Sequence, residues 1–311
     1  MKGFMTESLR GLKIPAFPEG TYLIILAAAI YGLTIVLTKG ALEQIPPFTL
    51  LCIQTSASVC VFWTILICQG IQIPWGWSTL KLSLIGLLEP GLSYIFAVFG
   101  LSLTTASNAT FINTTEPIVT IALSWLILRE HVNFSLVGLG LLACIGVAFI
   151  SIPSATASIA QGSTWGDLLI CLSVLFASLY AVTAARSVQR LHLVALAAIQ
   201  QSVALIFFVV MLLGAVLLGL ETFEFTPAMW SSLLVAIVSG AFGYGLAFLL
   251  YLAAVRYLPA SRLSLYLTLT PVFGVISAYL ILGERLLVAQ GLGGSLILLA
   301  VISIPRVSHQ K

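Results

Sequence analysis

Ten long apolar runs, separated by short polar connections, take up most of the 311 residues of the chain. A helix needs roughly 20 apolar residues to cross the hydrocarbon core of a bilayer. Only 7% of the residues are charged, whereas soluble domains average roughly 25%. The sequence therefore predicts an all-α membrane protein with ten transmembrane helices, over residues 21–38, 47–68, 80–101, 106–128, 134–152, 165–185, 193–219, 229–255, 262–282 and 286–304.

The distribution of basic residues predicts how the chain is threaded through the membrane. If the N-terminus is cytoplasmic, the inside-facing segments hold eleven of the thirteen lysines and arginines, and the outside-facing segments hold only Lys39 and Arg285. Short cytoplasmic connections are enriched in Lys and Arg, so we expect both termini to lie in the cytoplasm. We expect the protein itself to lie in the plasma membrane. A polar segment followed by an apolar run also resembles a signal peptide, but nine further spans and the charge bias favour a retained first helix.

The residues that bind metals or cofactors in other proteins do not form groups here. All five cysteines lie inside apolar runs without metal-ligand spacing, which favours packing over a disulfide framework. The chain also lacks the phosphate-binding pattern G-x-x-x-x-G-K-[ST]. We therefore expect no metal, no cofactor and no coupling to ATP, and the scattered basic residues argue against a nucleic-acid surface.

The chain contains an internal repeat. A gapless self-alignment at an offset of 154 residues matches residues 86–150 with residues 240–304. A weaker match at an offset of 146 residues pairs Gln54 with Gln200. The matched positions at the first offset include glycines, a proline and a helix-end acid: Gly86 and Gly240, Gly91 and Gly245, Pro117 and Pro271, and Glu130 and Glu284.

Because each half holds five spans, an odd number, the two halves are expected to cross the membrane in opposite senses. Inverted repeats of this kind are typical of secondary transporters, which bind substrate near the membrane midplane between the repeats. The predicted repeats are residues 1–152, which open with the cytoplasmic segment 1–20, and residues 153–311.

Several segments resemble a known family. PIVTIALSWLILREHV and PVFGVISAYLILGERL close the fourth and ninth spans, and the glycine-bearing helices GLGLLACIGVAFI and GLGGSLILLAVI follow them. With the repeat openings AAAIYGLTIVLTK and GDLLICLSVLFASLYAVTAAR, they resemble the EamA-type, ten-helix members of the drug/metabolite transporter superfamily over nearly the whole chain. The resemblance implies a pathway lined by spans 1, 3, 4, 6, 8 and 9. Many members have an arginine where this chain has Gln54 and Gln200.

Two glutamates lie deep inside apolar spans. Glu116 is roughly 20 Å from Arg129 at the end of its span, and Glu89 is roughly 12 Å from Lys81, at 1.5 Å rise per residue. Acids in transmembrane segments mark substrate or proton pathways, and an apolar environment or a second carboxylate favours the protonated form. We therefore expect Glu116 and Glu89 to carry a proton or to bind a substrate ammonium group.

Each acid precedes a proline, which leaves a second interpretation open. A proline frees a backbone carbonyl one turn earlier, and a protonated glutamate that donates to this carbonyl would only stabilise a kink. The repeat mates of Glu116 and Glu89 are Thr270 and Gly243, so these acids occur in the first half alone. The predicted hinges or kinks are Pro90, Pro117 and Pro271.

Polar and aromatic residues inside the spans are predicted to line the substrate or proton pathway, although each also fits ordinary packing. Together with Tyr251 they are Glu116, Glu89, Asn113, Tyr94, Gln54, Gln200, Tyr31, Tyr180, Tyr244 and Tyr266. Glycines in the fifth and tenth spans predict close helix approach or a weak homodimer face, so the chain is expected to be a monomer or a weak homodimer.

The leading interpretation is a secondary transporter, an exporter of amino acids, amines or drug-like amphipathic compounds, with proton coupling through Glu116. A nucleotide-sugar or sugar-phosphate carrier is the alternative within transport, but it needs cations near the midplane. An intramembrane enzyme would use Glu89 and Glu116 as an acid pair, without an accompanying G-x-S-G or H-E-x-x-H pattern. A receptor or scaffold would have little loop surface for partners.

Overall fold

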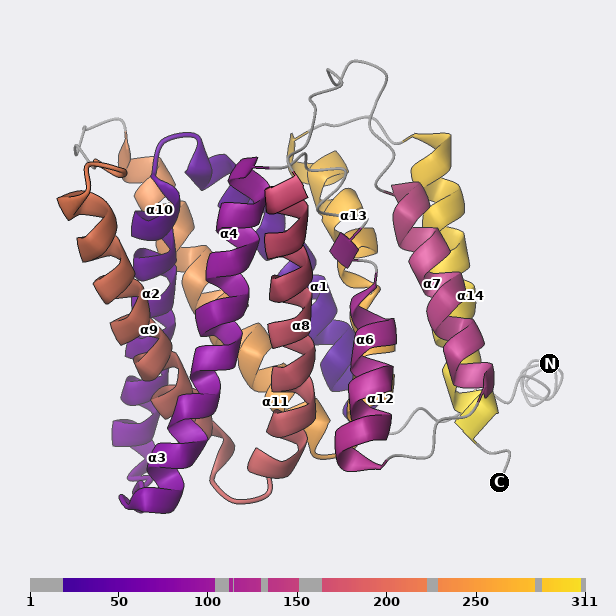
Figure 1. Cartoon of the computed structure of the whole chain (residues 1–311), viewed down its shortest axis with the longest axis horizontal. Coiled ribbons are helices and arrows are strands. Elements are labelled where there is room, and N and C mark those ends of the chain that lie inside the picture. The colour runs from indigo at the N-terminus through magenta and orange to yellow at the C-terminus, as the bar shows by residue number, and fades with distance from the viewer. Residues whose placement is uncertain are drawn as a thin grey trace, which may run out of the picture.

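The computed structural model describes residues 19–103, 112–113, 115–129, 134–150, 164–222, 229–282 and 287–308. Within these ranges all regular secondary structure is helical, and the helices run side by side along a roughly common direction (Figure 1). Eight of the described helices are long and apolar enough to cross a membrane, and two shorter apolar helices, Glu116–Leu128 and Phe134–Ile150, accompany them. The prediction of an all-helical, multi-pass membrane protein is confirmed, whereas the ten-span count, the inverted repeat and the orientation remain predictions.

In chain order the elements are α1 (Glu19–Leu42), α2 (Pro47–Gln69), α3 (Trp77–Leu84), η1 (Ile85–Leu87), η2 (Leu88–Leu92), α4 (Ser93–Leu103), α6 (Glu116–Leu123), η3 (Ser124–Leu128), α7 (Phe134–Ile150), α8 (Thr164–Ser187), α9 (Leu193–Leu217), α10 (Trp230–Ser239), η5 (Gly240–Ala247), α11 (Phe248–Val255), α12 (Ala260–Leu267), α13 (Thr270–Leu282) and α14 (Val288–Ser308). Most predicted spans agree with these helices to within a few residues. Part of the predicted span 106–128, namely residues 106–111 and 114, lies outside the described residues, as do Glu130 and Glu284.

Two spans are interrupted near their middles by π-helical turns. The turn η2 separates α3 and η1 from α4, and the longer turn η5 separates α10 from α11. The sequence explains both interruptions. Pro90 in η2 lacks a backbone N–H, and glycines at 240, 243 and 245 weaken helix formation in η5. The two π-helical turns occupy matching places in the self-alignment at 154 residues.

Contacts between distant parts of the chain build the core. Helix α1 packs against α13, η5 and α11, whereas α8 packs against α4 and α6, and α2 packs against α9 and η5. Small residues permit the closest approaches. A Cβ built on Gly32 would lie 2.6 Å from the backbone nitrogen of Gly274, so α1 and α13 are in backbone contact there.

Helices α7 and α14 form a pair at one edge of the molecule (Figure 1). A Cβ built on Gly293 would lie 2.3 Å from the carbonyl oxygen of Gly146, and one on Gly146 would lie 2.7 Å from the carbonyl oxygen of Gly293. Gly138 and Gly291, in contrast, have no atom within 4 Å of a built Cβ. One glycine of each helix, Gly146 in α7 and Gly293 in α14, therefore serves the contact within the chain.

Candidate functional site

Glu89 and Glu116 lie close enough to interact electrostatically. Glu89 belongs to η2, in the middle of the third span, and Glu116 is the first residue of α6. Both side chains are partly buried. Sequence alone could not fix how the two helices are rotated, and the structure brings the two carboxyl groups within electrostatic range of each other.

The backbone at Glu89 departs from helical geometry. Its φ of −147° and ψ of 131° are extended, whereas the flanking residues are helical. The ring of Pro90 disfavours helical geometry in the residue before it, so the sequence Glu89-Pro90 accounts for the break. The break places a carboxyl group at an interruption of the helix, where backbone polar groups need partners.

Glu116 and Pro117 lie at the start of helix α6. Pro117 lies in the first turn of α6, where its missing N–H costs little because the first N–H groups of a helix lack partners in any case. A carboxylate at this end also interacts favourably with the helix dipole. The acid and the proline therefore have complementary local roles.

The repeat mate of this region has the same construction. Helix α12 ends at Leu267, Thr268 and Leu269 form a turn, and α13 begins at Thr270 with Pro271 in its first turn. Both matched prolines thus lie in the first turn of a helix. Their role as hinges stays a prediction.

Several aromatic hydroxyl groups lie within electrostatic range of the acid pair. Glu89 interacts electrostatically with four tyrosines, and Glu116 interacts with Tyr251. The tyrosines in the group come from α1, α4, α8, η5 and α11: Tyr31, Tyr94, Tyr180, Tyr244 and Tyr251. The two acids and these tyrosines, called the acid–tyrosine cluster below, bring together most of the predicted pathway residues.

Ring contacts fix several of these tyrosines. The rings of Tyr94 and Tyr244 meet edge to face, with centroids 5.3 Å apart at an interplanar angle of 85°. Tyr180 stacks with Tyr251 at 6.2 Å and with Phe248 at 5.9 Å. Edge-to-face and offset arrangements are the favourable ones for aromatic pairs, so the cluster has defined aromatic walls.

The two predicted glutamines lie in helix contacts and are fully buried. Gln200 accepts a hydrogen bond from the Tyr180 hydroxyl at 2.9 Å and donates one to the carbonyl oxygen of Leu82 at 3.2 Å. Gln54 donates to Thr38 at 2.8 Å and to Ser239 at 2.9 Å. Gln200 thereby connects one cluster tyrosine to the third span, while Gln54 connects α1, α2 and α10.

Two other predicted residues lie apart from the acids. Tyr266 is buried beside Thr21 and Arg262, and its described electrostatic neighbours do not include Glu89 or Glu116. Asn113 is exposed. The structure therefore does not bring these two residues into the acid–tyrosine cluster.

Some polar contacts near the cluster were not foreseen from the sequence. Gln201 donates to the carbonyl oxygen of Tyr244 at 3.1 Å, within the π-helical turn η5. Thr120 on α6 donates to the Ser178 hydroxyl on α8 at 3.0 Å. A glutamine next to Gln200, in the run IQQS, was the available signal for the first contact, and Ser and Thr inside apolar spans were the signal for the second.

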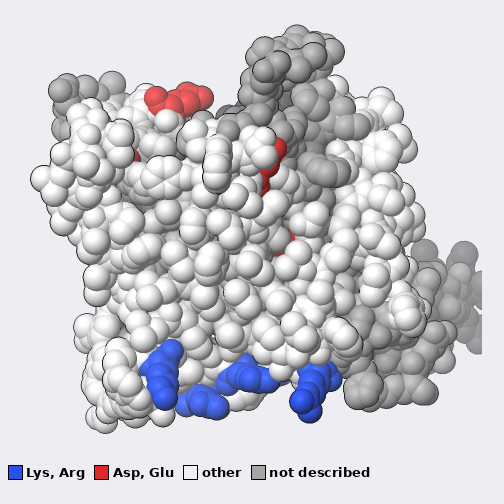
Figure 2. All heavy atoms as spheres, viewed as in Figure 1, with Lys and Arg blue, Asp and Glu red and all other residues white. Residues whose placement is uncertain are grey.

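Charged side chains gather at the ends of the molecule. Figure 2 shows Lys and Arg along one end, called the basic end below, and acidic side chains toward the other. The described basic side chains at helix ends and in connections are Lys81, Arg129, Arg186, Arg190, Arg256 and Arg262. Figure 2 shows no Lys or Arg of the described residues in the middle of the visible face.

Comparison with known proteins adds a family match. The sequence model of the EamA-like transporter family matches residues 19–152 and 164–305. A solved structure described as a crystal structure of a protein superposes with a TM-score of 0.77 at 16% identity and covers 91% of this chain and 97% of its own. At that identity the superposition supports the fold alone.

Three relatives are described as uncharacterized transporters. YcxC of Bacillus subtilis is 28% identical over 192 residues, which is 59% of this chain and 59% of its own length. A Methanothermobacter thermautotrophicus protein is 27% identical over 71% of this chain and 63% of its own length. An Archaeoglobus fulgidus protein is 28% identical over 90% of this chain and 83% of its own. The chain thus matches less than two thirds of the length of the first two.

Proposed function

The chain belongs to the EamA-like transporter family, and on this basis we propose that it is a secondary transporter that exports small organic metabolites across the plasma membrane. The proposed substrates are amino acids, amines and drug-like amphipathic compounds that carry an ammonium group. The observation that carries the proposal is the acid–tyrosine cluster, in which Glu89 interacts electrostatically with Glu116 and with tyrosines of several helices.

The chemistry of the cluster supports an ammonium group as the recognised feature. Carboxylates attract ammonium groups, and aromatic faces add a cation–π attraction. Tyrosine hydroxyls provide hydrogen-bond partners in surroundings that are otherwise apolar. A substrate with a cationic head and an aromatic or aliphatic body would meet complementary groups at each part.

We further propose that the chain moves by alternating access between two inverted halves, residues 1–152 and 153–311, with N- and C-termini in the cytoplasm. The paired interruptions η2 and η5, and the paired helix starts at Pro117 and Pro271, support this relation because they recur at the offset of 154 residues. Discontinuous helices at a repeat interface are a feature of secondary transporters. The basic end in Figure 2 would face the cytoplasm.

Proton coupling is assigned to Glu116 in this proposal. At such a carboxyl group, a proton and the substrate ammonium group compete for the same site. A bound ammonium group favours the ionised carboxylate, whereas protonation removes the negative charge that binds the substrate. Proton entry from one side would therefore release substrate there.

The test uses purified protein in liposomes loaded with a labelled panel of amino acids and amines, with and without a pH gradient. We expect the gradient to accelerate flux of ammonium-bearing substrates in the wild type, and Glu116→Gln to remove the acceleration. Glu43→Gln, which alters an exposed acid outside the cluster, is the matched control and should behave as wild type. A Glu116→Gln protein with unchanged rate and pH dependence would refute proton coupling, and absence of flux for the whole panel would refute the substrate class.

A further inference from the structure

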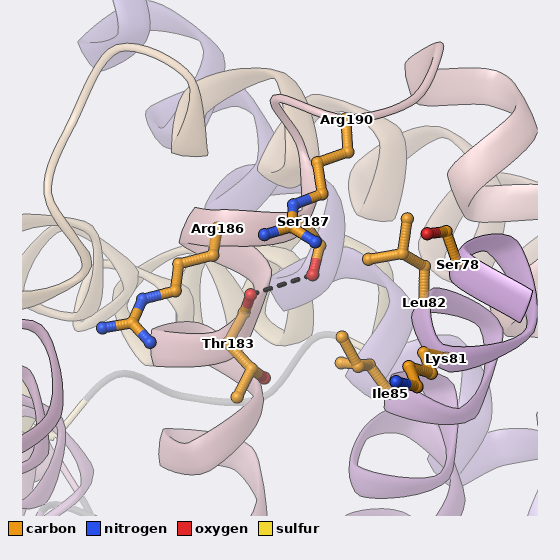
Figure 3. Close-up of a pocket in the computed structure, with 8 residues that line it drawn as sticks. All are labelled: Ser78, Lys81, Leu82, Ile85, Thr183, Arg186, Ser187 and Arg190. Carbon is orange, nitrogen blue, oxygen red and sulfur yellow. Dashed lines mark hydrogen bonds between the residues drawn. The ribbon is translucent and has the colours of Figure 1, made fainter.

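A cavity of about 320 Å³ opens at the basic end, between the third span and the end of α8. Its walls, which Figure 3 shows as sticks, are Ser78, Lys81, Leu82, Ile85, Thr183, Arg186, Ser187 and Arg190. Called the basic cavity here, it is separate from the acid–tyrosine cluster, with which it shares no lining residue. The proposed transport function does not use it.

The lining contains three cationic side chains and no acidic one. Lys81, Arg186 and Arg190 are all exposed, and within the described parts of the chain none of them forms an ion pair. Like charges held around one cavity repel each other, and an anion between them would relieve the repulsion. The charge balance therefore indicates a negatively charged ligand.

Local contacts orient two of the cations in advance. Arg186 donates from Nη2 to the carbonyl oxygen of Ile127 at 2.9 Å, which fixes its guanidinium and leaves its other N–H groups available. Lys81 lies over the Trp77 ring, with Nζ 5.8 Å from the centroid. Figure 3 shows Arg190, which follows the last residue of α8, extending along Ser187, whereas Arg186 extends to the other side.

Of the three hydroxyl groups that line the cavity, two already donate hydrogen bonds within α8 and one does not. Ser187 donates to the carbonyl oxygen of Thr183 at 2.9 Å, and Thr183 donates to the carbonyl oxygen of Leu179 at 2.8 Å. Ser78 has no hydrogen-bond partner among the residues that the structure describes. An anion in the cavity would therefore be bound by guanidinium and ammonium groups and by the Ser78 hydroxyl.

The position of the cavity indicates a lipid as the source of the anion. Trp75 and Trp77, close to it along the chain, are about three quarters exposed, and tryptophans mark the headgroup level of membranes. Leu82 and Ile85 provide an apolar wall below the cations. Basic pockets between transmembrane helices bind anionic lipid headgroups, and arginine forks match phosphate oxygens. We propose that the basic cavity binds the phosphate of an anionic phospholipid headgroup.

Native mass spectrometry of the detergent-purified protein, titrated with phosphatidylglycerol or phosphatidylcholine, tests this without reference to transport. We expect selective retention of phosphatidylglycerol, and a loss of affinity of about tenfold in Arg190→Gln and in Lys81→Gln, in line with one charge-assisted contact. Arg190→Lys should retain part of the affinity. Arg129→Gln, an exposed cation outside the cavity, is the matched control and should bind as wild type.

Two results would overturn the proposal. One is phosphatidylglycerol binding in both Arg190→Gln and Lys81→Gln that equals wild type, with thermal unfolding showing that at least one variant is folded. The other is displacement of the lipid by equimolar inorganic phosphate, which would make free phosphate the ligand. Because the two variants lie on different elements, a folding defect in one leaves the other to decide.

Discussion

Gly86 lies directly against Gln200, so that a Cβ built on Gly86 would stand 2.5 Å from the carbonyl oxygen of Gln200. Gly240 lies in the same way against Gln54, where the distance would be 2.3 Å. The two glycines match at an offset of 154 residues, and the two glutamines match at 146. Each contact joins one half of the sequence to the other, and the pair supports the proposed repeat.

These two glycines are expected to be intolerant of alanine. A methyl group at Gly86 or Gly240 would meet backbone atoms below 3.0 Å, and overpacking of this kind costs roughly 1–3 kcal/mol. Thermal unfolding of the purified protein in detergent should therefore show a lower midpoint for Gly86→Ala and Gly240→Ala. Gly214→Ala, where a built Cβ meets nothing within 4 Å, should not lower it, and equal midpoints for all three would contradict the packing described.

Removing the Tyr180 hydroxyl should destabilise the protein while the packing of the aromatic ring is kept. Tyr180→Phe keeps the ring but leaves the buried Oε1 of Gln200 without its 2.9 Å donor, at a cost of roughly 1–3 kcal/mol. Tyr251→Phe is the control, since the Tyr251 hydroxyl has no hydrogen-bond partner among the described residues. The same unfolding measurement should separate the two variants, and a Tyr180→Phe midpoint at or above that of Tyr251→Phe would count against the contact.

Glu221 caps the N-terminus of α2 and so links the segment after α9 to the second helix. Its carboxylate accepts from the backbone nitrogens of Phe48 at 3.2 Å and Thr49 at 2.8 Å, and from the Thr49 hydroxyl at 2.8 Å. Glu221→Gln removes the negative charge from the helix N-terminus and brings an NH₂ group toward donors, so we expect a loss of roughly 1–3 kcal/mol. Glu43→Gln serves as the exposed control, and equal unfolding free energies for both variants would exclude a stabilising cap.

The acid pair should behave as a coupled unit. Because Glu89 and Glu116 interact electrostatically, the effects of Glu89→Gln and Glu116→Gln on unfolding free energy should not add, with a coupling of at least roughly 0.5 kcal/mol. The coupling should be measurable at alkaline pH, where carboxyl groups ionise, and should vanish in acid, where both are neutral. A cycle with Glu43 in place of Glu89 should be additive at every pH; additivity in the Glu89 cycle at alkaline pH would show that the carboxyl groups are not neighbours.

The sequence predicted the spans well, because long apolar runs leave a membrane chain few choices. The break in the third span coincides with the predicted position Pro90, since a proline acts locally on the residue before it. The sequence pattern did not predict which way the side chains point. In a chain that is apolar on nearly every helix face, lipid-facing and buried positions have similar composition. The pattern therefore does not reveal that Gln54 and Gln200 lie in helix contacts, or that Tyr180 interacts electrostatically with Glu89.

The basic cavity was equally hidden in the sequence. Lys81 and Arg186 are each unremarkable at their own positions, as basic residues near the ends of apolar spans. They share a cavity only because α8 ends beside the start of the third span, a relation between segments roughly a hundred residues apart. Long-range packing of this kind depends on tertiary structure that local patterns do not encode.

The contact of Gly146 with Gly293 has a consequence for how the protein is made. Helix α7 enters the membrane while α14 is still to be synthesised, so the surface around Gly146 first faces lipid. Lipid chains pack less closely against this glycine than the backbone of α14 does. That surface is completed only when α14 has been synthesised. Assembly of this edge therefore waits for the translation of α14, and α7 keeps an unmatched face until that helix has joined it.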